Sequence, residues 1–260
     1  FLIDHYVIKG AGSHSRVTGA GVLYNPLLSA HVFGFYMALL LGLLLQMNWD
    51  WKKNTAVIGL LLPVTMFVLM THSRTPLLGL MAIMLVYLLI NRNKKSAIIF
   101  CGFLAIGALI YYCYPAQFSS RGLSYRPWIW RYTLGVISEQ PIWGTGVNNT
   151  FAVPYPQDVN QGKGAWADPH NIHLSVILRV GLMGFSLWLL MYWNSFRGMV
   201  LETQSKYNKA FFLVLVFGAA CALTEGGAFF SRPKEHWFII WLPIALCVAA
   251  QVSGEIRKRL

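Results

Sequence analysis

The chain has 260 residues, of which 56% are hydrophobic and only 12% are charged, and its mean hydropathy is +0.52. Soluble domains carry about 25% charged residues, so this composition excludes an ordinary soluble globular protein. The net charge of +12 comes from 21 Lys and Arg residues against 9 Asp and Glu residues. In a membrane protein such an excess is typical of cytoplasmic anchoring charge, so it does not predict nucleic-acid binding.

Seven apolar segments are long enough to cross a membrane as helices. They cover residues 27–47, 55–71, 75–90, 97–114, 172–193, 210–230 and 237–252. The sequence therefore predicts an all-α, polytopic membrane helical bundle. Only His72-Ser73-Arg74 separates the second segment from the third, which predicts a tight helical hairpin. Because the chain starts at Phe1 without a signal peptide, we expect it to be the C-terminal part of a longer protein with earlier spans.

The basic residues predict which side of the membrane each connection faces. The short connections rich in Lys and Arg, which we place in the cytoplasm, are residues 48–54, 91–96, 194–209 and 253–260. We therefore expect three regions along the chain. They are residues 1–114 with an outer N-terminal segment and four helices, residues 115–171 as a long outer loop, and residues 172–260 with three helices and a cytoplasmic tail.

The charges expected on the outer side are mostly arginines. They include Arg16, Arg74, Arg121, Arg126 and Arg131. The planar guanidinium presents a fork of donors that matches phosphate oxygens, so this surface is predicted to bind an anion. The alternative is that these side chains contact lipid headgroups. Arg179 and Glu225 lie inside apolar segments, where a functional role and a structural pairing both stay open.

Within the long loop, Pro127 favours the start of a short helix that runs to about Ser138. The tryptophans of this helix suit the level of the lipid headgroups. Gln140-Pro141 is expected to end it, and Gly144-Thr145-Gly146 predicts a tight turn.

The loop ends in Asp168-Pro169-His170-Asn171-Ile172-His173. Asp168 is a good N-cap residue, which predicts His170 in the first turn of the following helix. The field there favours a neutral imidazole, the form that a general base needs. The alternative is a polar cap at the membrane interface. His173 follows three residues later and could share a helix face with His170, but no further metal ligands accompany them, so no metal site is expected.

Together these residues resemble the O-antigen ligase and polymerase superfamily of bacterial envelope biogenesis. The elements that carry the resemblance are Arg16-Val-Thr-Gly with Asn25-Pro26, Ser73-Arg74, Arg126-x-Trp128-x-Trp130, Pro141-x-x-Gly144-x-Gly146, Pro169-His170-Asn171 and Gly181-x-x-Gly184. They span most of the chain. The resemblance implies a multi-pass protein of the bacterial inner membrane with about a dozen spans and a periplasmic active site.

The resemblance further implies a glycosyltransferase that needs neither metal nor cofactor. Its donor would be a glycan on a polyprenyl-pyrophosphate carrier, its acceptor lipid A–core, and its only other partners membrane lipids. Arg126 and Arg74 match the family's loop and hairpin arginines, and His170 matches the histidine taken as the base for the acceptor hydroxyl. Arg16, Arg121, Arg131 and His173 are expected to help bind the substrates. A direct attack would invert the anomeric carbon.

Two groups of alternatives stay open. A polysaccharide polymerase or a protein O-oligosaccharyltransferase would use the same donor, and the compact loop leaves the acceptor undecided. A membrane transporter would belong to a different class and predicts broken helices and polar residues near the bilayer midplane. The predicted spans look clean at their centres, which disfavours transport.

Overall fold

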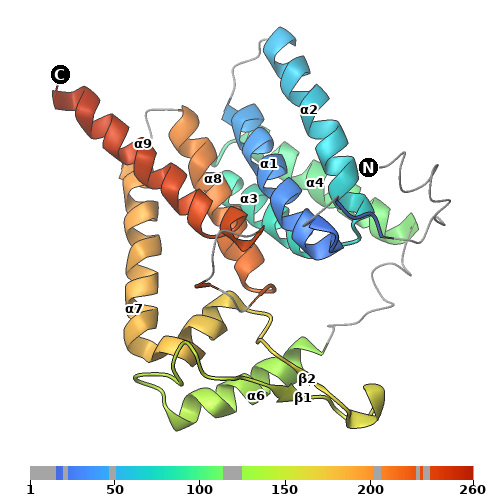
Figure 1. The fold of residues 1–260 in the computed structure, drawn as a ribbon. Coiled ribbons are helices and arrows are strands. Elements are labelled where there is room, and N and C mark those ends of the chain that lie inside the picture. Colours follow the sequence, from blue (N-terminus) through green and yellow to red (C-terminus); the bar gives the residue numbers. More distant parts are fainter. Residues whose placement is uncertain are drawn as a thin grey trace. The chain divides into compact units, whose positions relative to one another are not determined.

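A computed structural model describes residues 16–19, 23–46, 51–113, 125–201, 206–226, 229–230 and 235–259 (Figure 1). Its helices are α1 (Pro26–Gln46), α2 (Trp51–Met70), α3 (Thr75–Asn91), α4 (Lys94–Cys113), α6 (Arg126–Glu139), α7 (Ile172–Leu201), α8 (Lys206–Ala222) and α9 (Trp241–Arg259). Short 3₁₀ turns, η3 (Asn160–Gly162) and η4 (Glu235–Phe238), and two strands, β1 (Val153–Pro154) and β2 (Ala165–Trp166), complete the elements. The predicted all-α fold is confirmed.

Each apolar segment predicted as a span contains or overlaps a helix, although α8 ends at Ala222, before the end of the predicted segment 210–230. Four helical stretches are long and apolar enough to cross a membrane: Pro26–Gln46, Lys94–Cys113, Ile172–Gly198 and His236–Ser253. Three more are apolar but shorter: Thr55–Met70, Thr75–Asn91 and Tyr207–Ala222. The chain is therefore a membrane protein. The short helix predicted between Pro127 and Ser138 is α6, and the predicted ending at Gln140 is its C-cap.

The chain divides into two compact units, which we describe separately. Unit 1 comprises the described residues within 1–109, 195–221 and 233–260, and unit 2 those within 110–194 and 222–232.

In unit 1, the buried ring of Phe217 on α8 packs against glycines of two other helices. A Cβ atom added to Gly79 of α3 would lie 2.4 Å from Phe217 Cδ2, and one added to Gly34 of α1 would lie 2.9 Å from Phe217 Cζ. Inside lipid, helix association depends on close van der Waals packing, which small residues permit. The glycines therefore allow α1 and α3 to approach one aromatic side chain from α8.

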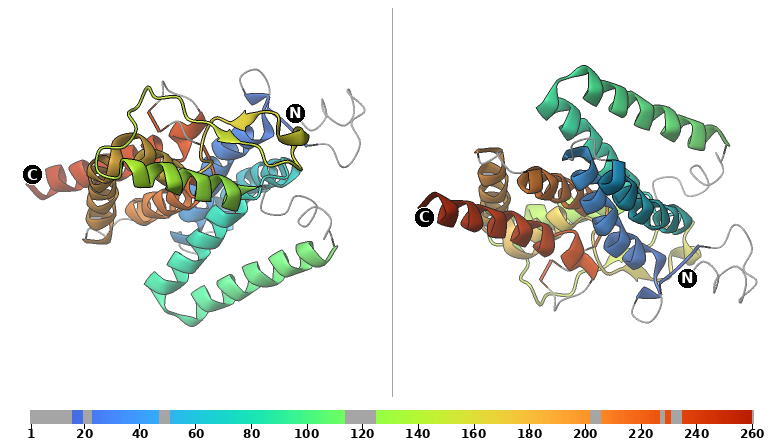
Figure 2. Two further views of the ribbon diagram at one scale, coloured as in Figure 1. Left: turned by 90° about the horizontal axis from the view of Figure 1, so that it is seen from below. Right: turned by 90° about the horizontal axis from the view of Figure 1, so that it is seen from above.

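The predicted hairpin between α2 and α3 is confirmed. His72 adopts a left-handed conformation with φ 51°, and Pro76 lies in the first turn of α3. The segment Arg16–Gly19 lies against this turn, because Val17 N donates to Met70 O at 3.0 Å. At the other end of α3, Arg92 is left-handed (φ 46°), and α3 and α4 leave this turn in different directions (Figure 2).

Unit 2 contains α6 and a small antiparallel sheet in which Val153 pairs with Trp166. The helix buries Ile129 and Thr133, and Trp128 Nε1 donates to Pro154 O of β1 at 3.2 Å. Tyr125, directly before α6, donates to the Asp158 carboxylate at 2.7 Å, and this hydrogen bond raises the pKa of the tyrosine. These contacts join the start of α6 to the loop that contains the sheet.

The part of α7 in unit 2 is broken at Gly181, which has φ 62° and ψ −170° (Figure 1). The two helical hydrogen bonds lost there are replaced by bonds to the segment 141–146. Leu182 N donates to Pro141 O at 2.9 Å and Met183 N to Ile142 O at 3.3 Å. In return, the carbonyls of α7 before the break accept from Thr145 N at 2.7 Å and Gly146 N at 2.9 Å.

The segment 172–193, predicted as a span, is therefore a helix interrupted at Gly181. Buried backbone groups must find partners, and here a neighbouring loop supplies them in place of the helix itself. The glycines predicted to form a tight turn do so: Gly144 has φ 73° and Gly146 φ 92°. A Cβ atom added to Gly181 would lie 2.1 Å from Ile142 O, so only glycine fits this close approach.

We expect Gly181→Ala to destabilise the protein. The substitution places a side chain at φ 62° and against backbone that cannot move aside, and left-handed strain alone costs on the order of 1–3 kcal/mol. The apparent Tm in detergent, followed by tryptophan fluorescence, should fall by about 5 °C or more.

The matched control for this measurement is Gly135→Ala on α6. A Cβ atom added at Gly135 has open space around it, and alanine is the better helix former by roughly 0.5–1 kcal/mol. Its Tm should equal or exceed that of the wild type. A Gly181→Ala protein as stable as the Gly135→Ala protein would show that the break does not require glycine.

Candidate active site

Arg126 is the first residue of α6, and its guanidinium is held by the segment that follows α8. Its Nη2 donates to Thr224 O at 2.6 Å and lies 3.6 Å from Glu225 Oε1. The Glu225 side chain is only 5% exposed and that of Arg126 25%. Arg126 Nε is buried and has no hydrogen-bond partner among the described residues. One edge of the guanidinium is thus anchored by the segment that follows α8.

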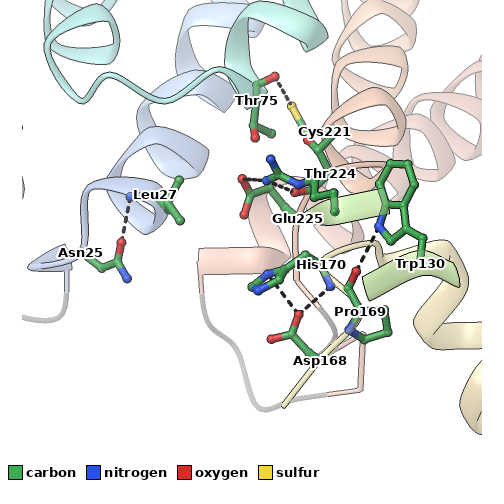
Figure 3. Close-up of polar contacts among 11 residues, drawn as sticks. Asn25, Leu27, Thr75, Trp130, Asp168, Pro169, His170, Cys221, Thr224 and Glu225 are labelled. Atoms are coloured by element: carbon green, nitrogen blue, oxygen red, sulfur yellow. Dashed lines mark hydrogen bonds and ion pairs between the residues drawn. The ribbon is translucent and has the colours of Figure 1, made fainter. Parts of the chain in front are cut away.

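His170 lies in a turn directly before α7. Asp168 Oδ1 accepts a hydrogen bond from His170 N at 2.8 Å, and His170 Nδ1 lies 3.2 Å from the same oxygen (Figure 3). Trp130, one helical turn after Arg126 on α6, donates from Nε1 to Pro169 O at 3.1 Å (Figure 3). Helix α6 therefore both carries Arg126 and supports the turn that carries His170.

The predicted capping of α7 is wrong by three residues. Asn171, not Asp168, is the cap, because Asn171 Oδ1 accepts from Leu174 N at 3.0 Å and α7 begins at Ile172. His170 has φ 49° and stands before the helix instead of in its first turn. A left-handed residue cannot continue a right-handed helix. His170 and His173 are consequently not related by helical spacing.

His173 lies within α7 among aromatic rings. Trp188 Nε1 donates to His173 Nδ1 at 3.1 Å, and the rings of Trp188 and Tyr192 lie 6.2 Å and 6.1 Å from the imidazole. A neutral imidazole that accepts at Nδ1 carries its proton on Nε2. Neither nitrogen of His173 then offers a lone pair to a substrate. His170 is the better placed of the two histidines to act as a base.

The structure distributes the remaining predicted arginines between the two units. In unit 1, Arg16 Nε donates to Thr71 O at 2.7 Å, which brings Arg16 to the hairpin turn that contains Arg74. Arg74 is half-buried and precedes α3. In unit 2, Arg131 is exposed on α6. Arg121 lies outside the described residues.

The two charges whose roles stayed open, Glu225 and Arg179, both have partners in unit 2. Glu225 pairs with Arg126. Arg179 Nη1 donates to Val147 O at 3.1 Å and also to Asn149 O, which binds the loop after the tight turn to α7. Glu225 was conspicuous as a charge in a predicted apolar segment, but its sequence distance from Arg126 hid its partner.

Within the described ranges, no three His, Cys, Asp or Glu side chains gather in a way that could hold a metal ion.

Comparison with known proteins relates the chain to one family. A family model described as O-antigen ligase matches residues 58–189, a segment that includes Arg74, Arg126 and His170. The chain is also 40% identical over 247 residues to a protein of Pseudomonas aeruginosa named O-antigen ligase. That alignment covers 92% of this chain, whereas the chain spans 58% of the relative's length.

We expect Arg126 and Glu225 to be energetically coupled. Arg126→Ala and Glu225→Gln should each lower the apparent Tm. The double variant should lose less free energy of unfolding than the sum of the two single losses, by about 0.5–3 kcal/mol. The individual losses should stay below the roughly 3–5 kcal/mol of a fully buried pair, because the arginine side chain is one-quarter exposed.

The control for this cycle pairs Glu225→Gln with Arg131→Ala, since Arg131 is an exposed arginine of the same helix. The effects of those two substitutions on the free energy of unfolding should be additive. Additive effects in both cycles would show that the contact between Arg126 and Glu225 contributes nothing to stability.

Proposed function

Because the chain belongs to the O-antigen ligase family, we propose that it transfers an O-antigen-type glycan from a polyprenyl-pyrophosphate carrier to lipid A–core. The reaction would take place at the periplasmic face of the bacterial inner membrane, with residues 115–171 as the catalytic loop. The observation that carries this proposal is the arrangement around α6. That helix holds an anchored arginine, Arg126, at its first residue and supports the turn of His170 through Trp130.

Arg126 would bind the pyrophosphate of the donor. The bond between the anomeric carbon and the phosphate oxygen breaks with its electron pair on the leaving pyrophosphate, which therefore gains charge. Charge-assisted donors aimed at that oxygen stabilise the transition state. Since Thr224 and Glu225 already fix the guanidinium, little reorganisation is needed when the anion arrives.

His170 would act as general base. An acceptor hydroxyl oxygen attacks the anomeric carbon from the side opposite the pyrophosphate, which inverts the configuration, and its proton passes to the imidazole. The proton then leaves to water, and no metal or cofactor takes part. The left-handed backbone at His170 supports this role, because residues held in such conformations cluster at functional sites.

Five further residues would assist substrate binding. Arg74, with Arg16 at the same turn, would bind phosphate groups of the substrates, and Arg131 and Arg121 would contact outer phosphates of donor or acceptor. His173 would shape the site beside the first turn of α7, since Trp188 already occupies its Nδ1.

The two competing functions differ in what they predict. A polysaccharide polymerase or a protein O-oligosaccharyltransferase would use the same arginines and histidine with another acceptor. A transporter would use the break in α7 to bind an ion or solute. Here backbone groups at the break are instead hydrogen-bonded to residues 141–146, which favours an enzyme over a transporter.

The direct test is a transfer assay with the purified protein in proteoliposomes and a defined polyprenyl-pyrophosphate glycan. Lipid A–core, a second donor glycan and an acceptor protein are offered separately. Glycosylated lipid A–core is the expected product. Product on the second glycan or on protein would identify one of the sibling activities, and movement of the donor without any transfer would contradict the proposal.

We expect Arg126→Lys to lose most of the transfer activity. Lysine keeps the charge but not the planar fork that binds two oxygens at once, so the loss should appear as a fall in kcat/KM for the donor of about tenfold or more. Lys163→Ala removes an exposed charge from the same loop and should be nearly silent. Equal, mild effects of both changes would reduce Arg126 to a headgroup contact.

We expect His170→Gln to lower turnover by about 10²–10⁴-fold, because glutamine cannot accept a proton near neutral pH. The variant should still insert into membranes and bind donor. His173→Gln should cost much less, since its Nδ1 already accepts from Trp188. Near-normal transfer by His170→Gln protein would remove the histidine from the mechanism.

A further inference from the structure

Asp168 makes two contacts with His170 through a single carboxylate oxygen. Oδ1 accepts from the backbone N–H of His170 at 2.8 Å and lies 3.2 Å from Nδ1 of its imidazole. The first contact closes a local turn. The second concerns the reacting side chain and is not needed for the turn.

The second contact determines which nitrogen of His170 carries the proton. A carboxylate only accepts hydrogen bonds, so it favours the tautomer with the proton on Nδ1 and the lone pair on Nε2. His173 shows the opposite case, because an indole donor faces its Nδ1. The two histidines are thus set in different tautomers by their neighbours, and only His170 has a basic nitrogen directed away from its partner.

The exposure of the His170 and Asp168 side chains agrees with His170 as the base. The side chains of His170 and Asp168 are 35% and 37% exposed, so the imidazole can be reached by a substrate while the carboxylate remains beside it. When Nε2 takes the acceptor's proton, the imidazolium forms next to a negative charge that is already in place. No reorientation of the carboxylate is then required.

We propose that Asp168 is the positioning residue of His170: it selects the Nδ1–H tautomer and stabilises the imidazolium formed during transfer. This inference rests on the proposed function, in which His170 is the base. The competing explanation is that Asp168 serves only to close the turn before α7.

The substitution Asp168→Asn separates the two explanations. Asparagine keeps an Oδ1 that can accept from the His170 N–H, but it lacks the charge. If Asp168 positions and stabilises the imidazole, kcat falls by about tenfold or more, up to the 10²–10⁴-fold of the base itself, while the donor KM stays within about twofold. If Asp168 only closes the turn, Asp168→Asn turns over like the wild type, and the inference is overturned. A changed donor KM with normal kcat would also overturn it.

The matched control is Asp158→Asn, which removes a carboxylate from the same loop that accepts from Tyr125 and forms no hydrogen bond or ion pair with His170 among the described residues. It should leave kcat unchanged. Asp168→Glu keeps the charge on a longer stem and should recover part of the activity that Asp168→Asn loses.

A second readout does not depend on activity. Side-chain ¹⁵N NMR of the complete protein in lipid nanodiscs distinguishes the two imidazole tautomers, and loss of a signal in His170→Gln assigns it. His170 should carry its proton on Nδ1 in the wild type and become a mixture of tautomers in Asp168→Ala. A wild-type His170 protonated on Nε2 would overturn the inference.

These measurements can reject the role of Asp168 and the proposed function independently. If the wild type transfers no glycan from a polyprenyl-pyrophosphate donor, the proposed function is wrong while the NMR result still decides the tautomer. If wild type is active, His170→Gln is inactive and Asp168→Asn is normal, only the role of Asp168 is wrong.

Discussion

The break in α7 at Gly181 is the constraint on which the geometry of unit 2 depends. Two backbone hydrogen bonds of the helix are exchanged for bonds to residues 141–146, and the same residues follow directly after α6. The C-terminal end of α6 is thereby bound to the backbone of α7. Because α6 carries Arg126 at its other end and reaches the His170 turn through Trp130, the position of both candidate catalytic groups follows from this exchange.

Arg126 and His170 each lie beside a carboxylate, and the two carboxylates differ in burial. Glu225 is buried against Arg126, where a low dielectric strengthens the attraction and makes the loss of either partner costly. Asp168 and His170 remain about one-third exposed, so water screens their attraction but also leaves the imidazole accessible. In the proposed mechanism, the arginine would need a fixed position before an anion arrives, whereas the histidine would exchange a proton with a substrate. The difference in burial suits each task.

Glycine has the same function in both units, namely to allow backbone or rings to approach closely. In unit 1, Gly34 and Gly79 accommodate the ring of Phe217. In unit 2, Gly144 and Gly181 face one another, and a Cβ atom added to Gly144 would lie 2.5 Å from Gly181 N. Lipid offers helices no hydrophobic gain on association, so such contacts supply much of the packing.

Several features follow from the sequence by itself. Long apolar segments cannot be exposed to water, and a backbone in lipid must satisfy its own hydrogen bonds, so the apolar segments between residues 27 and 252 were bound to form membrane helices. The short separation of two such segments required the hairpin at His72–Arg74, and Pro127 with Gln140 bounded α6. The order of arginine, glycine and histidine motifs was sufficient to indicate the family to which the chain belongs.

Only the tertiary structure decided which charged side chains pair with one another. Arg126 and Glu225 are 99 positions apart in the sequence, and no local pattern connects them. The break at Gly181 is invisible to hydropathy, which treats a broken apolar helix and a continuous one alike. Asp168 and Asn171 are both polar residues that can cap the start of α7. Asn171 is the cap, because the left-handed backbone at His170 prevents the helix from starting before it. Sequence determines which residues can form a helix or bind an anion, but long-range packing determines which charge meets which.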